Sequence, residues 1–397
     1  MTRRLDVGER RRRLAVRHHL APGHGAVDPA EVADRLVALH SSDPATVHLA
    51  VAARSDAGIA DVERALHVDR TMLRMRGPRR SVFACSLDSG VLVHAACHRE
   101  VAAWERDKLT AVLAESGIHD AGSWLPDAEA DALAALAARG EAVPADLADD
   151  VERLRIEIGP STGVGYGSRQ RIAGRVLYLL AADGRAARGR PRGTWASGQY
   201  TWRPMTDFYP GGLPRVATDD AEDALARRWL TTYGPATETD LRWWTGWTIT
   251  RTRRVLARIA PAEVDLDGAP GLLLPDDLDP VPDVDPWAAL LPGLDPTVMG
   301  WKDRRWYLGE HERALTDYSG NVGTTVWWDG RVVGVWGQDR DGVVVCGFAD
   351  DVGSEARTAV DAEASRLTRA LDGVRLGARA RSRSPLEASL LPQVAAT

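Results

Sequence analysis

Residues 69–87 read DRTMLRMRGPRRSVFACSL, and this stretch decides the fold. Leu73 and Met75 alternate with arginines, which is the pattern of a β-strand with one buried face. The GPRR segment at 77–80 is a turn signal, and the apolar run at 82–85 leads the chain back along the first strand. The stretch therefore predicts a two-stranded hairpin with arginines at its tip.

The residues before this hairpin carry apolar side chains at helical spacing, interrupted by Gly and Pro. We expect four helices there, at 6–20, at 28–40, after Asp43-Pro44 and at 60–68. Several helices followed by a hairpin with a basic tip are the layout of a winged helix, in which the hairpin is the wing.

The segment LHSSDPATVHLAVAAR, residues 39–54, holds a helix end, a polar turn and a new helix start. Its first polar residues, His40-Ser41-Ser42, form a tight corner that could carry chemistry. His40 is either a packed histidine at a helix end or a catalytic group. Asp43 precedes a proline, so it is either the N-cap of the next helix or a general base.

The same pattern of helices and basic hairpin recurs further along the chain. We expect helices at 88–117, 127–139, 144–158 and 169–184, with a break at Ser123–Asp127, and then a hairpin at GRAARGRPRGTW, residues 184–195. A third, poorer copy has helices at 222–234, 235–247 with Thr237 as cap, and 249–259, followed by GLLLP at 271–275. Three tandem units are therefore predicted.

The character of the chain changes after the acidic, proline-rich segment 275–286. Residues 323–348 read as three short strands joined by Asp-Gly turns, and a helix at 353–371 and a last short strand follow. The predicted fold class is α+β, mainly α, with tandem winged-helix domains and a small β-rich C-terminal module. The expected domains are 1–122, 123–215, 216–286 and 287–397.

Composition narrows the class of protein. The net charge is −6, which argues against a uniformly basic nucleic-acid binder, yet of 50 basic residues only Lys108 and Lys302 are lysines and the arginines cluster. We expect no membrane span, no secretory signal, no metal and no cofactor, because the corresponding apolar runs and ligand or phosphate motifs are missing. Three scattered cysteines fit a reducing, cytoplasmic compartment.

The arginines of the two hairpins are candidates for contacts with a polyanion, since forked cations on a projecting ribbon suit backbone phosphates. The alternative is that they protect solvated edge strands from aggregation. Two such hairpins, each after a helical set, favour nucleic acid. The candidate DNA-binding residues are Arg74, Arg76, Arg79, Arg80, Arg169, Arg171, Arg188, Arg190 and Arg192.

Six segments in this order make the chain similar to the AlkZ/YcaQ-like family of tandem winged-helix DNA glycosylases. They are LHSSDPATVHLAVAAR, DRTMLRMRGPRRSVF, SRQRIAGRVLYLLAADGRAARGRPRGTW, YGPATETDLRWWTGW, LLPGLDPTVMGWKDR and VWWDGRVVGVW. The resemblance implies a C-shaped set of winged helices around duplex DNA. It also implies excision of alkylated purines, cationic N7-alkylguanine types among them, without a lyase step, and in some members crosslink repair and genotoxin resistance.

The family's catalytic corner usually reads Gln-Φ-Gln or Gln-Φ-Asp (Φ, hydrophobic), where this chain has His40-Ser41-Ser42. We therefore expect His40, Ser42 and Asp43 to be the catalytic residues of a monofunctional glycosylase acting on alkylated duplex DNA as a monomer. The alternative is a winged-helix DNA-binding protein, a regulator or lesion-shielding factor, whose corner is a degenerate active site. A protein-interaction scaffold is a third reading.

Overall fold

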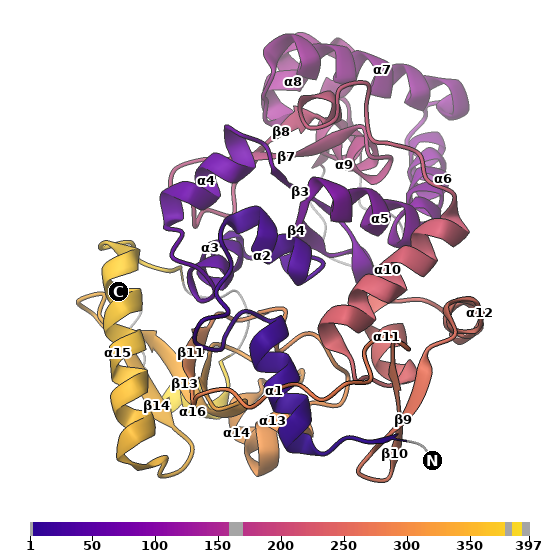
Figure 1. Cartoon of the computed structure of the whole chain (residues 1–397). Coiled ribbons are helices and arrows are strands. Elements are labelled where there is room, and N and C mark those ends of the chain that lie inside the picture. Colours follow the sequence, from indigo (N-terminus) through magenta and orange to yellow (C-terminus); the bar gives the residue numbers. More distant parts are fainter. Residues whose placement is uncertain (1–2, 159–169, 378–382, 391–397) are drawn as a thin grey trace.

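The computed structural model describes residues 3–158, 170–377 and 383–390 of the chain. It is a mixed α/β protein in which helices predominate (Figure 1). Helices α7 and α8 lie at one end of the molecule, and the C-terminal sheet with α15 lies toward the other. A five-stranded sheet and α10 lie between them, so the arginine hairpins occupy the middle of the molecule.

The N-terminal helices are α1 (Val7–Arg17), α2 (Pro29–Arg35), α3 (Pro44–Ala52) and α4 (Ile59–His67). The expected helix at 28–40 ends early, at Arg35, because Val37 has a left-handed backbone (φ 66°) that a helix cannot continue through. Residues Leu39–His40 instead form strand β2. His40 therefore lies at a sheet edge and not at a helix end.

The first hairpin is confirmed as strands β3 (Met72–Arg76) and β4 (Val82–Ser86), joined by the 3-10 turn Pro78–Arg80. Leu73, Met75 and Phe83 enter the largest apolar core, while Met72 and Ala84 face a second core beneath α2–α4. Both faces of the hairpin are thus covered along much of its length.

The middle of the chain is helical, with one short strand pair. Its elements are α5 (Leu87–Cys97), α6 (Arg99–Glu115), α7 (Ala121–Arg139), α8 (Pro144–Asp150), β5 (Glu157–Ile158), β6 (Gln170–Arg171) and α9 (Ile172–Ala182). The predicted break at Ser123–Asp127 was wrong. Pro126 is the sixth residue of α7, and the chain breaks earlier, where Gly117 adopts a left-handed φ of 92°.

The second hairpin consists of β7 (Ala186–Pro191) and β8 (Tyr200–Pro204). It joins the first hairpin in a single sheet of order β2-β4-β3-β7-β8, through one antiparallel pair, Arg74 with Arg188. The two predicted wings are therefore neighbours in one sheet. The domain boundaries at residues 122, 215 and 286, and the winged-helix assignment itself, stay predictions.

The third helical set is α10 (Thr218–Tyr233), α11 (Glu238–Thr245) and α12 (Ile249–Ile259), and the Thr237 cap is confirmed by its bond to the Asp240 amide. A short hairpin follows, β9 (Ala262–Leu266) and β10 (Ala269–Leu273), to which β1 (Arg3–Arg4) adds a parallel strand.

The C-terminal part contains the three expected strands and a fourth. Its elements are β11 (Ala288–Leu291), α13 (Arg305–Leu308), α14 (Glu312–Leu315), β12 (Thr325–Trp328), β13 (Arg331–Gln338), β14 (Val344–Phe348), α15 (Gly353–Leu371) and α16 (Pro385–Leu390). The helix at 353–371 is confirmed. The expected last strand is not found in the described residues beyond Leu371, where α16 is the regular element.

The acidic segment 275–286 is anchored to α1 by ion pairs. Asp277 bonds both Arg13 and Arg17, and Asp283 lies 3.3 Å from Arg12. The carboxylates of Asp277 and Asp283 therefore help to hold this segment against helix α1. No helix among the described residues has the length and apolar character needed to cross a membrane.

Candidate catalytic corner and cationic hairpins

The corner lies between β2 and α3. His40 pairs with Phe83 of β4, its ring lies 5.0 Å from the Phe83 ring, and only 6% of the residue is exposed. The Ser42 amide donates a 3.4 Å hydrogen bond to His40 Nδ1. With Nδ1 as acceptor, the neutral imidazole carries its proton on Nε2. Ser42 itself is exposed.

Asp43 caps helix α3. Its Oδ1 accepts a 3.0 Å bond from the Ala45 amide, and Pro44 occupies the first helical position. The capping interpretation is thus confirmed. Asp43 is partly exposed and lies beside Ser42, so capping does not remove its side chain from chemistry at this corner.

Arg74 holds the backbone of the corner. Its Nε donates to Ser41 Oγ at 2.7 Å and its Nη2 to the Ser41 carbonyl at 3.1 Å. This corrects the prediction that Arg74 contacts phosphate: only 4% of the residue is exposed, because α3 and α4 cover that face of β3. Burial lowers the pKa of Arg74 to about 10, against the opposing charges of Glu63 and Asp43, so it is still a cation at neutral pH.

Beneath α3 lies a carboxylate that the sequence analysis missed. Glu63 of α4 accepts from His48 Nε2 at 3.0 Å, and His48 Nδ1 lies 3.2 Å from the Pro44 carbonyl. Arg190, a candidate DNA-binding residue, also reaches Glu63 at 3.4 Å. The second hairpin is thereby tied to the first turn of α3.

Glu63 and its neighbours have shifted pKa values. Burial would raise the pKa of Glu63, but the hydrogen bond from His48 and the nearby cation of Arg190 outweigh burial and lower the pKa. Burial lowers the pKa of His67 to about 4, so this ring is neutral at physiological pH. No sequence signal marked these residues, because Glu63 and His67 look like ordinary positions of an amphipathic helix.

Arginines at the tip of the first hairpin have aromatic partners. Arg76, Arg79 and Arg80 lie over Tyr178, Trp243 and Trp104, with guanidinium carbons 4.2, 4.1 and 4.6 Å from the ring centroids. No carboxylate of the described residues lies within ion-pair distance of these three side chains. Their charge is therefore not neutralised locally.

In the second hairpin Arg188 lies 3.3 Å from the Tyr200 ring centroid and 4.7 Å from that of Trp202. Burial, and then the charges of Arg74 and Arg76, lower its pKa to about 9. The cations of the two hairpins therefore converge. Arg171 and Arg192 are exposed, and Arg169 lies outside the described residues.

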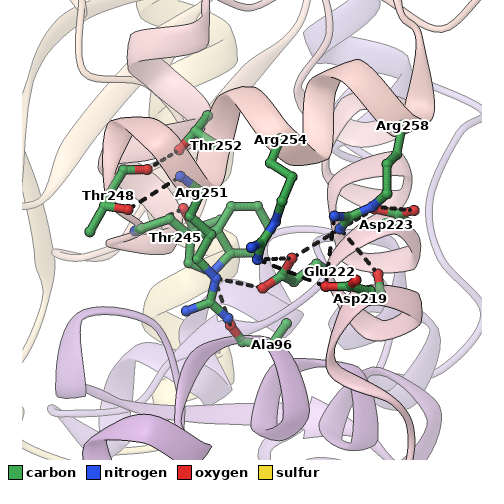
Figure 2. Close-up of polar contacts among 11 residues, drawn as sticks. Ala96, Asp219, Glu222, Asp223, Thr245, Thr248, Arg251, Thr252, Arg254 and Arg258 are labelled. Carbon is green, nitrogen blue, oxygen red and sulfur yellow. Dashed lines mark hydrogen bonds and ion pairs between the residues drawn. The ribbon is translucent and has the colours of Figure 1, made fainter.

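Helix α12 carries a different kind of arginine row. Figure 2 shows Arg251, Arg254 and Arg258 pointing at acidic side chains of α10. Glu222, which is fully buried, lies 2.6, 3.6 and 3.0 Å from them in that order. Asp219 and Asp223 add further ion pairs. The charge of α12 is thus largely compensated within the protein.

These features define a helix-and-hairpin protein that brings uncompensated arginines together beside a polar corner. The family model described as DNA glycosylase AlkZ-like matches residues 33–370, and the chain belongs to this family.

A curated relative and a solved structure, both from Streptomyces sahachiroi, are similar to this chain. An interstrand DNA cross-link repair glycosylase is 31% identical over 215 residues, which are 52% of this chain and 57% of that protein. The matched region thus spans little more than half of that relative. The solved structure of the DNA glycosylase AlkZ has the same fold, with a TM-score of 0.69 and 21% identity over 95% of this chain and 99% of that chain.

Proposed function

We propose that this protein is a monofunctional DNA glycosylase that hydrolyses the N-glycosidic bond of alkylated purines, of the N7-alkylguanine type, in duplex DNA. One observation carries the proposal: the His40–Asp43 corner is built into the sheet in which the two arginine hairpins meet. The cross-link repair activity in the relative's name extends the substrate class to cross-linked N7-alkyl purines, with genotoxin resistance as the role. We propose that it acts as a cytoplasmic monomer without a cofactor.

Cleavage of the N-glycosidic bond needs little help from the protein, because a cationic N7-alkyl base is already a good leaving group. The site must stabilise an oxocarbenium-like sugar and place a water at C1′. The exposed Ser42 hydroxyl can orient that water, and the Asp43 carboxylate beside it can accept its proton. His40 holds the Ser42 amide through Nδ1, so in this geometry it acts mainly by fixing Ser42.

Mass spectrometry of free bases released from N7-methylated duplex DNA tests the proposal. We expect release by the wild type and loss of release in His40→Ala and in Asp43→Asn. Asp28→Asn is the matched control, since Asp28 caps α2 in the same way ahead of Pro29 but lies away from the corner. Unchanged single-turnover rates in His40→Ala would remove His40 from the mechanism.

A second candidate function is non-catalytic DNA binding, and one observation favours it: the His40 ring is buried against Phe83 with Nδ1 bonded to a backbone amide. Such a ring can be purely structural. Wild-type protein that binds methylated duplex DNA tightly but releases no base would establish this function in place of the first.

A further inference from the structure

A basic pocket opens at the tip of the first hairpin. It lies between the hairpin turn, the end of α5, the start of α6 and the turn from α11 to α12, and holds about 680 Å³ of space that includes solvent at its mouth. The titratable side chains that line it are Arg79, Arg80, Cys97, His98 and Arg251. No carboxylate lines it among the side chains that the structure describes.

The arginines of the pocket keep hydrogen-bond donors available. The guanidinium groups of Arg79 and Arg80 lie over the rings of Trp243 and Trp104 and donate no hydrogen bond to another group among the described residues. Arg79 Nε is buried with no hydrogen-bond partner among the described residues. Burial lowers the pKa of Arg79, as expected of a cation without a counter-charge.

His98 adds an unpaired polar group. It is 1% exposed, and neither ring nitrogen has a hydrogen-bond partner among the described residues. A buried donor left without a partner costs about 1–3 kcal/mol, so such a group calls for a ligand. Burial, and then the charges of Arg76, His94 and Arg80, lower its pKa to about 3, so the ring is neutral and offers one N–H.

The far wall of the pocket is fixed by the α10–α12 network. Arg251 donates from Nε to the buried Glu222 at 2.6 Å and from Nη2 to the Ala96 carbonyl at 2.7 Å (Figure 2). The Arg251 guanidinium is therefore held in place on this wall, while the hairpin side supplies the uncompensated charge.

Strand β4 connects the pocket to the corner. The Ser41 amide donates a 2.8 Å bond to the carbonyl of Val82, two residues beyond Arg80, and His40 pairs with the next residue, Phe83. A group bound at Arg80 would lie close to a nucleotide placed at His40–Asp43.

We propose that this pocket binds a phosphate group of the DNA backbone next to the nucleotide at the corner, with Arg79, Arg80 and the His98 N–H as donors. The proposal rests on the proposed function for its DNA, but not on base release. Free inorganic phosphate is the other source of the same chemistry, and the test separates the two.

The test follows the imidazole NMR signals of His98 in histidine-labelled full-length protein, assigned with His98→Leu. An unmodified DNA duplex is added in one arm, and inorganic phosphate, at matched ionic strength in sodium chloride, in the other. We expect the duplex to shift the His98 signals in the wild type but not in Arg80→Gln. We also expect about a tenfold weaker duplex affinity in His98→Leu and Arg80→Gln, in fluorescence anisotropy.

Arg253→Gln is the matched control, because Arg253 is exposed on α12, is paired with Glu238 and does not line the pocket. It should bind the duplex as the wild type does. Signals that move with inorganic phosphate but not with the duplex, or with neither, would overturn the proposal. Signals that move with the duplex in a protein that releases no base would support the pocket and refute the glycosylase.

Discussion

The tip of the β3–β4 hairpin and helix α12 each carry a row of arginines, and the protein treats them in opposite ways. The hairpin arginines lie on aromatic rings with no carboxylate of the described residues in ion-pair distance. The α12 arginines converge on Glu222, Asp219 and Asp223 (Figure 2). The difference teaches that a basic sequence does not by itself make a surface for phosphate. What counts is whether the fold supplies a counter-charge.

The largest expected effect is on the stability of the protein, through the α12 arginines that acidic side chains compensate. Glu222→Gln removes a fully buried carboxylate that three arginines share. The weaker pairing of Arg251, Arg254 and Arg258 should cost about 3 kcal/mol of unfolding free energy, although Asp219 and Asp223 still pair with the last two. Urea unfolding measures this. Glu238→Gln, which breaks the exposed pair with Arg253, should cost less than about 1 kcal/mol. Equal losses in the two variants would show that the Glu222 network is not special.

A second prediction concerns how His98, beside the hairpin arginines, makes the unfolding free energy depend on pH. His98 has a pKa of about 3 in the folded protein against about 6.5 unfolded, so the folded state binds fewer protons between these values. Its contribution is fully present above pH 6.5 and is lost as the pH falls toward 3. Between pH 7 and pH 5 the wild type should lose about 2 kcal/mol that His98→Leu does not lose.

Unfolding free energies at the two pH values measure the loss. His119→Leu is the control for the loss of a histidine, because His119 is exposed and does not line the pocket. A His98→Leu variant with the same pH dependence as the wild type would contradict the assignment of a neutral His98.

The smallest expected effect is on duplex binding itself. Arg188→Gln should lower the slope of log affinity against log salt by about 0.9, because it removes one cation that lacks a counter-charge. Arg258→Gln should leave the slope unchanged, since Asp223 and Glu222 already hold that charge. A salt titration of unmodified duplex DNA measures both slopes. If both variants lost the same slope, the distinction between the two arginine rows would fail.

Local patterns in the sequence predicted the elements that local forces determine. The alternation around Leu73 and the GPRR turn predicted the first hairpin, and Asp43 and Thr237 marked helix starts that the structure confirms. The family resemblance was likewise confirmed.

The features that sequence reasoning missed depend on contacts between distant segments. Strand β2 exists because Leu39–His40 pairs with β4. The Arg74–Arg188 pair between the two hairpins joins residues more than a hundred positions apart. The alternation predicted that Arg74 and Leu73 lie on opposite faces of strand β3. It could not show that α3 and α4 cover the face that carries Arg74. The same limitation hid Glu63, whose role depends on His48 and Arg190 approaching it from other elements.

The single pair Arg74–Arg188 has a mechanical consequence. This pair joins β3 to β7, and β4 joins β3 to β2. A displacement of either hairpin is therefore transmitted through the backbone hydrogen bonds of the sheet to strand β2, which holds His40. If the hairpins bind DNA as we propose, a contact at either hairpin will also affect the position of His40. Amides along β2, β3 and β7 should open to hydrogen exchange together, as one cooperative unit, and a duplex that tightens one ribbon should slow exchange in all three.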